Sequence, residues 1–223
     1  MAAGGRPRRL PGGAWEGLLA RALRLVDAID ERGVGDPLWT FGGGTVLMLR
    51  YQHRQSRDID IFVPDPQYLG HVSPRLSDVA KSVSADYVEG PGYVKLIRPE
   101  GEIDFVASSN LTGSPFDIWT LQGRPVHVET ASGIVAKKLW YRGDRVTARD
   151  LFDLSLVIER EPEALLMAAE YLVRHRAAFV GQLSERAAVL KAQFDAIDRL
   201  KYRPTFDDAA TRTAQFLEAL PAA

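Results

Sequence analysis

Apolar positions recur at helical spacing in the first part of the chain and at strand spacing shortly after it. Over residues 15–33 they return every three or four positions, with charged residues on the other faces, which predicts an amphipathic helix. Residues 38–41 indicate a short buried strand that runs into three glycines. Thr45 is the predicted N-cap of a helix over 46–54. Polar and apolar residues alternate over 58–63, which predicts a half-buried strand.

The rest of the chain divides into a part with strands and a helical part. The pattern predicts a helix over 71–83, a hairpin of strands 94–97 and 102–106, and a further strand over 125–128. Beyond residue 131 most segments have a helical period, and the predicted helices are 132–142, 148–159, 162–177, 180–198 and 207–219. We therefore predict an α+β fold in which a small mixed-sheet core is followed by an α-helical C-terminal half.

These patterns also suggest how the chain is organised. We expect a flexible N-terminus over 1–13, an α/β core with a leading helix over 14–130 and a helical region over 131–223. The two larger regions are expected to form one interdependent unit around a shared cleft.

Composition excludes several classes of protein. The 223 residues are 46% hydrophobic and 26% charged, with a formal net charge of −1, so neither a disordered chain nor a strongly basic nucleic-acid binder is indicated. The sequence has no cysteine, which excludes disulfides and thiolate chemistry and favours a cytoplasmic location. Charged residues interrupt every apolar stretch near the N-terminus, so neither a signal peptide nor membrane association is expected.

The sharpest candidate for chemistry is Asp58-Ile59-Asp60. Side chains alternate across a strand, so both carboxylates project from one face. Two adjacent carboxylates repel each other, and a divalent cation would relieve the repulsion; Mg²⁺ prefers such oxygen ligands and phosphates, and Mn²⁺ is an alternative. Taken alone, Asp-x-Asp is more typical of the solvent face of an amphipathic edge strand, and its neighbours in the sequence favour the metal site. A second strand offers Asp104 as a third carboxylate or as an ordinary exposed aspartate.

Two further features could bind phosphate. The backbone amides of Gly43, Gly44 and Thr45 are placed to meet an anion at a helix N-terminus, although a triple glycine on its own is more often just a tight turn. Two runs are rich in basic residues, 50–57 and 137–149, and either could instead be a solvated helix face. The candidates from these runs are Arg54, Lys137 and Arg149, and Ser56 lies beside the carboxylates. The four histidines are scattered and give no zinc pattern.

Four ordered motifs resemble the nucleotidyltransferase family of the AbiEii/AbiGii abortive-infection toxins. The motifs are a Gly-Gly-Thr turn, a Ser-x-Asp-x-Asp strand, a helix with a Lys-Leu pair and an Arg-Asp-x-x-Asp-Leu helix start, and they lie between residues 38 and 158. This chain departs from the pattern by an extra glycine before the pair and by Lys137, where the family often has an acid.

The resemblance implies roles for individual residues. Asp58 and Asp60 would bind the metal, with Ser56 near the triphosphate and the glycine turn on the nucleotide phosphates. Lys138 would match the family's essential lysine and Asp150 its essential late aspartate. Asp104 would hold a second metal or accept the proton of the attacking hydroxyl.

The function that follows is Mg²⁺-dependent transfer of a nucleoside monophosphate from a nucleoside triphosphate to an acceptor hydroxyl, with release of pyrophosphate. In the family, tRNA 3′ ends are an acceptor class, and a cognate antitoxin commonly restrains the toxin. Two alternatives stay open: a kinase that transfers the γ-phosphoryl group to protein, and a nucleotide-binding protein without catalysis. The base of the nucleotide, the acceptor and the oligomeric state are not indicated by the sequence.

Overall fold

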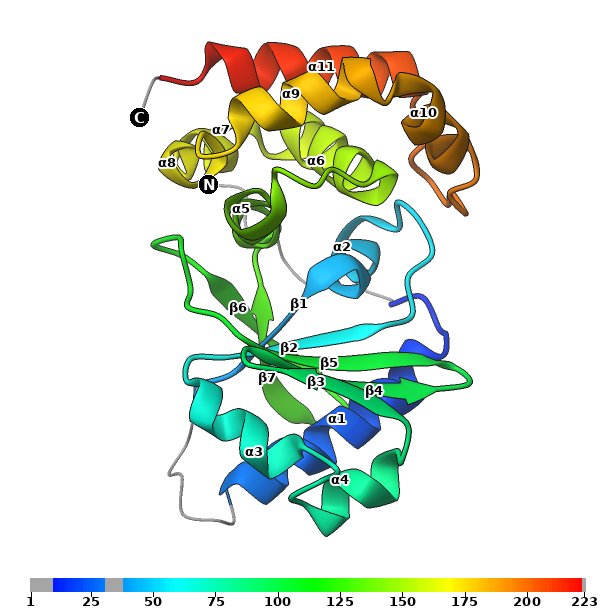
Figure 1. The fold of residues 1–223 in the computed structure, drawn as a ribbon, viewed down its shortest axis with the longest axis vertical. Coiled ribbons are helices and arrows are strands. Elements are labelled where there is room, and N and C mark those ends of the chain that lie inside the picture. The colour runs from blue at the N-terminus through cyan, green and yellow to red at the C-terminus, as the bar shows by residue number, and fades with distance from the viewer. Residues whose placement is uncertain (1–9, 31–37, 222–223) are drawn as a thin grey trace. The chain divides into compact units, whose positions relative to one another are not determined.

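The computed structural model describes residues 10–30 and 38–221, and the chain divides into two compact units. Unit 1 contains the described residues up to Arg50 together with Ser56–Asn110 and Phe116–Glu129. Unit 2 contains Tyr51–Gln55, Leu111–Pro115 and the chain from Thr130 onward. Each unit is therefore assembled from stretches that are separated in sequence, and each is described by itself (Figure 1).

Unit 1 is built on a seven-stranded mixed sheet with the strand order β3-β4-β5-β2-β1-β7-β6. Its strands are β1 (Thr40–Gly42), β2 (Ile59–Val63), β3 (Tyr87–Gly90), β4 (Tyr93–Arg98), β5 (Gly101–Ala107), β6 (Phe116–Leu121) and β7 (Arg124–Glu129). β2 runs parallel to β5, and β1 runs parallel to β7, whereas β1 and β2 are antiparallel. The sheet is therefore mixed at its centre.

Helices cover both faces of this sheet. They are α1 (Trp15–Asp30), α2 (Gly43–Tyr51), η1 (Pro66–Tyr68), α3 (Leu69–Val72) and α4 (Asp78–Val83). Figure 1 shows α2 on one face and α1, α3 and α4 on the other. The core under α1 contains the fully buried Ile59, Ile103 and Phe105, so the alternate residues of β2 and β5 project from the opposite face.

Unit 2 is helical. Its helices are α5 (Ala131–Arg142), α6 (Ala148–Arg160), α7 (Pro162–Leu166), α8 (Ala169–Leu172), α9 (Arg176–Glu185), α10 (Ala187–Asp195) and α11 (Phe206–Ala219). Helices α5, α10 and α11 all pack on α6. Phe152 of α6 lies 5.2 Å from both Phe194 and Tyr202, measured between ring centroids. No helix in the described ranges is long and apolar enough to cross a membrane.

The predicted α+β class is confirmed, because a mixed sheet precedes a run of helices. The strand over 58–63, the hairpin of β4 and β5, and the strand over 125–128 are present, as are the helices predicted over 132–142, 148–159 and 207–219. The predicted end of the first helix near Gly33, and most of the predicted flexible segment 1–13, lie outside the described residues.

The single helix predicted over 71–83 is wrong, because the chain forms α3 and α4 with a break between them. Pro74 disfavours helical backbone at the residue before it, and Ser73 is extended, with ψ of 125°. Ser77 then caps α4 by accepting a hydrogen bond from the amide of Ala80. Apolar residues recur at helical spacing across the whole segment, which suggested one helix. The proline and the cap residue were the sequence signals for the break.

The helices predicted over 162–177 and 180–198 are also wrong in extent. The first region divides into α7 and α8, and the second into α9 and α10. At the second break, Arg186 leaves helical geometry, and its guanidinium donates to the side chain of Gln182. Neither break carries a glycine or a proline, so tertiary packing rather than local sequence determines them.

Thr45 does not cap α2, which begins two residues earlier at Gly43 and ends at Tyr51 instead of Arg54. Gly43 has φ of 73°, a left-handed conformation that lets the chain leave β1 and enter the helix at once. β3 and β6 were not predicted.

Candidate functional site

In unit 1 the candidate carboxylates lie on two neighbouring parallel strands. Asp60 of β2 is in register with Asp104 of β5, so their side chains project from the same face of the sheet. Asp58 lies just before β2 and two residues from Asp60. Ile59 and Ile61, between and after them, are fully buried. Strand alternation thus separates an apolar face from an acidic one.

Hydrogen bonds join these carboxylates to the start of β5. An oxygen of Asp58, Oδ1, accepts a hydrogen bond of 3.1 Å from the backbone amide of Glu102. The Nζ of Lys95 on β4 lies 3.0 Å from Oδ2 of Asp104 and also contacts the carboxylate of Glu102. We call Asp58, Asp60, Glu102 and Asp104 the acidic cluster.

Asp104 has spare acceptor capacity. Its second oxygen, Oδ1, is buried and has no hydrogen-bond partner among the described residues. Burial raises the pKa of Asp104, and the negative charges of Glu102 and Asp58 raise it further, against the opposing effect of Lys95. For Lys95, burial lowers the pKa, but hydrogen bonds and charge from Glu102 and Asp104 outweigh it and raise the pKa.

The glycine turn lies directly against the acidic cluster. A Cβ built on Gly43 would come within 1.8 Å of Oδ2 of Asp60, so only glycine fits there. A Cβ on Gly42 would come within 2.3 Å of Oε2 of Glu129. Glu129 is 1% exposed and accepts a 2.7 Å hydrogen bond from the hydroxyl of Thr40. The sequence did not single out this buried acid, although a glutamate that ends an apolar strand was a visible signal.

The hydroxyl groups of Thr45 and Ser56 form hydrogen bonds where α2 meets the start of β2, and the predicted contacts of both residues with phosphate stay predictions. The hydroxyl of Thr45 is buried, donates to the backbone oxygen of Asp58 at 2.6 Å and lies 3.0 Å from the hydroxyl of Ser56. These bonds fix the start of β2 to the first turn of α2. Gly44, the other predicted phosphate contact, is half-buried in that turn.

The acidic cluster fits a hard divalent cation by its chemistry. Its donors are carboxylate oxygens, and Asp104 offers a buried oxygen that has no other partner in the described chain. As the side chains stand, no group of three histidine, cysteine, aspartate or glutamate residues within 10–30 and 38–221 is arranged to hold a metal ion. The Asp104 carboxylate is instead paired with Lys95.

In unit 2, Lys138 joins the two acids of its neighbouring helix. Its Nζ lies 3.0 Å from Oδ1 of Asp150 and also contacts Oδ2 of Asp153. Asp150 further accepts hydrogen bonds from Arg142 at 2.6 Å and from the hydroxyl of Thr147 at 2.7 Å. Lys138 and Asp150, predicted separately, are therefore direct partners.

Asp153 is the centre of this network, and sequence reasoning missed its importance. Its carboxylate is 0% exposed and receives both Nε and Nη2 of Arg54, at 2.7 and 2.8 Å. His53 donates from Nε2 to Oδ1 at 2.8 Å, since an ionised carboxylate can only accept. We call His53, Arg54, Lys138, Arg142, Asp150 and Asp153 the ion-pair network.

Burial and charge act in opposite directions on the acids of this network. Burial would raise the pKa of Asp153, but Arg54 and Lys138, with the hydrogen bond from His53, hold it well below its ordinary value. The pKa of Asp150 is lowered in the same way, against its burial, by Lys138 and Arg142. Burial lowers the pKa of His53, so its ring is neutral near pH 7.

The basic candidates for phosphate binding have different surroundings. The guanidinium of Arg54 is engaged by Asp153, and Lys137 is buried in α5, whereas Arg149 is exposed at the start of α6. Their roles in binding phosphate stay predictions.

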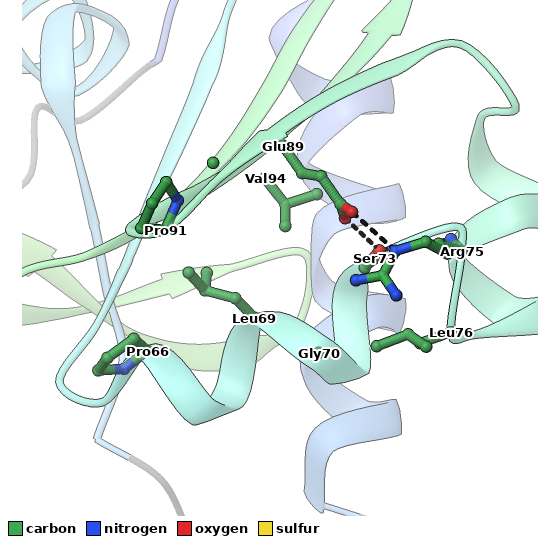
Figure 2. Close-up of a pocket in the computed structure, with 10 residues that line it drawn as sticks. Pro66, Leu69, Gly70, Ser73, Arg75, Leu76, Glu89, Pro91 and Val94 are labelled. Atoms are coloured by element: carbon green, nitrogen blue, oxygen red, sulfur yellow. Dashed lines mark hydrogen bonds and ion pairs between the residues drawn. The ribbon is translucent and has the colours of Figure 1, made fainter.

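A separate groove in unit 1 contains none of the predicted site residues. It has a volume of about 360 Å³ and lies beside α3 and the turn between β3 and β4 (Figure 2). At its wall, Glu89 accepts hydrogen bonds from Ser73 and Arg75. Val94 lines this groove, so the next residue, Lys95, projects from the other face of β4.

Comparisons with known proteins bear on both units. The sequence profile of the family described as "Nucleotidyl transferase AbiEii toxin, Type IV TA system" matches residues 24–220. A candidate nucleotidyltransferase from Helicobacter pylori superposes with a TM-score of 0.51 at 20% identity, covering 91% of this chain and 94% of the other. The nucleotidyltransferase toxin MenT4 from Mycobacterium tuberculosis gives a TM-score of 0.51 at 19% identity, with 93% and 85% covered. No curated protein matched in sequence. At these identities the solved structures establish the fold.

Proposed function

Because the chain belongs to the AbiEii family of nucleotidyltransferase toxins, we propose that it transfers a nucleoside monophosphate to the 3′ end of tRNA, with Mg²⁺ held by its acidic cluster. Membership confirms the resemblance drawn from the four motifs, and it makes the chain a nucleotidyltransferase that uses a nucleoside triphosphate. The family is one of toxin–antitoxin systems, which implies a cognate antitoxin. The metal, the acceptor and the residue roles are the proposal.

One observation carries the proposed chemistry: Asp60 and Asp104 are in register on parallel strands, with Asp58 two residues before Asp60, just ahead of β2. Asp58, Asp60 and Asp104 are the residues that would hold the cation. When bound, Mg²⁺ would neutralise phosphate charge at the reacting nucleotide. The acceptor hydroxyl oxygen forms a bond to the α-phosphorus, the bond from that phosphorus to the β-phosphate breaks, pyrophosphate leaves, and the hydroxyl proton passes to water.

Residues around the acidic cluster hold its carboxylates in position. Gly43 lets the start of α2 approach Asp60 without a side chain between them. Thr45 ties the backbone of Asp58 to α2, which fixes the direction of the carboxylates. Such preorganisation is typical of phosphoryl-transfer sites, where placement and charge provide most of the rate. The proposal of tRNA as the acceptor rests on the acceptor class implied by the family resemblance.

The test is label transfer with the full chain and Mg²⁺. We expect α-labelled nucleoside triphosphate to label tRNA in total RNA, and γ-labelled triphosphate to leave RNA and protein unlabelled. Periodate-oxidised tRNA, which lacks the 3′-terminal diol, should accept nothing. Asp58→Ala should abolish labelling, with Asp78→Ala, an exposed aspartate of α4, as the matched control.

Each of the other outcomes would contradict a different part of the proposed function. Transfer of the γ label to protein would replace nucleotidyl transfer by a kinase activity, and α label in protein rather than RNA would change the acceptor. Full activity of Asp58→Ala would remove the proposed metal site.

A further inference from the structure

Lys95 is a basic side chain that contacts two members of the acidic cluster, Glu102 and Asp104. Lys95 of β4 is in antiparallel register with Asp104 of β5, which is in register with Asp60 of β2, so all three project from one face of the sheet. The ammonium group contacts both Glu102 and Asp104. A lysine therefore occupies the side of Asp104 away from Asp60.

This ion pair is accessible and incomplete, unlike a buried structural pair. The side chains of Lys95 and Asp104 are 29% and 19% exposed, so ions from solvent can reach them. One oxygen of Asp104 is engaged by Lys95, while the other is buried without a partner in the described chain. Since a buried acceptor without a partner is costly, Asp104 gains from a second cation or donor.

We propose that Lys95 is an internal cation that competes with the divalent metal for Asp104, so that it weakens metal binding in the absence of nucleotide and thereby sets the metal affinity of the site. This inference rests on the proposed function, because it takes the acidic cluster as the metal site. The lysine ammonium is a compact charge on a flexible four-carbon chain, so it can withdraw when Asp104 turns to a metal. An ammonium close to a bound dication also repels it.

The competition between Lys95 and the metal affects metal binding as well as catalysis, so it can be measured without turnover. The probe is Mn²⁺, titrated into the full chain without nucleotide and followed by the electron paramagnetic resonance signal of the free ion. We expect Lys95→Met to lower the dissociation constant by about tenfold, because one repelling and competing charge is lost. Lys95→Arg, which keeps the charge, should stay within about twofold of the wild type.

Three further variants isolate the interaction between Lys95 and Asp104. Lys81→Met removes an exposed lysine of α4 and should leave Mn²⁺ binding unchanged. In an Asp104→Asn background, Lys95→Met should tighten binding far less than in the wild type, because the contested ligand is gone. Lys95→Gln still offers a hydrogen bond to Asp104, so it protects the fold and should shift Mn²⁺ binding in the same direction as methionine.

The outcomes separate this inference from the proposed function. If Asp58→Asn abolishes Mn²⁺ binding but Lys95→Met and Lys95→Gln leave it unchanged or weaken it, the competition is refuted and the metal site stands. If wild-type chain binds no Mn²⁺, or binds it equally well after Asp58→Asn and Asp60→Asn, the metal site falls and the role of Lys95 falls with it. Tighter binding in both variants that vanishes with Asp104→Asn supports the proposal.

Discussion

The two units each contain a group of charged residues, and the two groups differ in composition and burial. The acidic cluster of unit 1 is partly exposed and holds an oxygen of Asp104 that has no partner among the described residues. The ion-pair network of unit 2 surrounds Asp153, whose side chain is 0% exposed, with Arg54, Lys138 and His53. The first group thus keeps an acceptor oxygen for the cation that we propose, whereas the acids of the second are already paired with basic side chains.

The difference in burial and pairing indicates different roles for the aspartates of the acidic cluster and those of the ion-pair network. Carboxylates with spare acceptor capacity near solvent are suited to binding a metal. A fully buried carboxylate with several donors contributes to stability, because removing one partner leaves an uncompensated buried charge. Mutations of aspartates in the acidic cluster and in the ion-pair network are therefore expected to have different effects.

The largest expected effect is the loss of stability in Asp153→Asn. The change leaves Arg54 and Lys138 without their shared counterion, and we expect a loss of about 3–5 kcal/mol in the free energy of unfolding. Urea denaturation measures it. Asp104→Asn is the matched variant in the acidic cluster, and it should change stability by less than about 1 kcal/mol, because burial already disfavours the charge of Asp104. Equal losses in the two variants would erase the distinction between the groups.

Gly43→Ala should be next in size and should affect unit 1. The positive φ and the collision with Asp60 together should cost about 1–3 kcal/mol in stability and displace that carboxylate, with loss of most nucleotidyl transfer. Gly123→Ala is the control for backbone strain alone, because Gly123 has φ of 79° and nothing within 4 Å of its added Cβ. Equal transfer activity in the Gly43→Ala and Gly123→Ala variants would show that Asp60 does not need this close approach.

The pH dependence of stability should come from unit 2. Burial lowers the pKa of His53 below its ordinary value of 6.5, so the unfolded chain takes up a proton as pH falls through 6.5 while the folded chain does not. The free energy of unfolding should therefore decrease as pH falls below about 6.5. Thermal unfolding between pH 7.5 and 5 measures it. His53→Gln should flatten this part of the profile, and an unchanged slope would refute the assignment to His53.

The smallest effect is expected for Thr45→Val, which keeps the shape of the side chain but removes a buried hydroxyl. Loss of its hydrogen bond to the backbone oxygen of Asp58 should cost about 1–2 kcal/mol. If Thr45 also positions Asp58, transfer activity should fall more than stability does, and Thr45→Ser should restore it. Equal activity of the valine and serine variants would leave Thr45 with a purely structural role.

The sequence was most informative where the signal is local. The alternation in Asp58-Ile59-Asp60 predicted the acidic and apolar faces of β2, and the four motifs identified the family. The importance of Asp153 could not be found in this way, because its partners His53 and Arg54 lie about a hundred residues away. The contact of Lys95 with Asp104 depends on the register of β4 and β5, which a predicted hairpin does not determine.

The segment Tyr51–Gln55 belongs to unit 2 although the residues on both sides belong to unit 1. Backbone hydrogen bonds from Gln55 to Asp198 and from Leu200 to His53 hold it there. Replacing the C-terminal helices alone, from residue 130 onward, would leave His53 and Arg54 facing whatever side chain took the place of Asp153. The helices of unit 2 therefore depend on this short upstream segment, and the unit as a whole is encoded in three separate stretches of the chain, because Leu111–Pro115 also belongs to it.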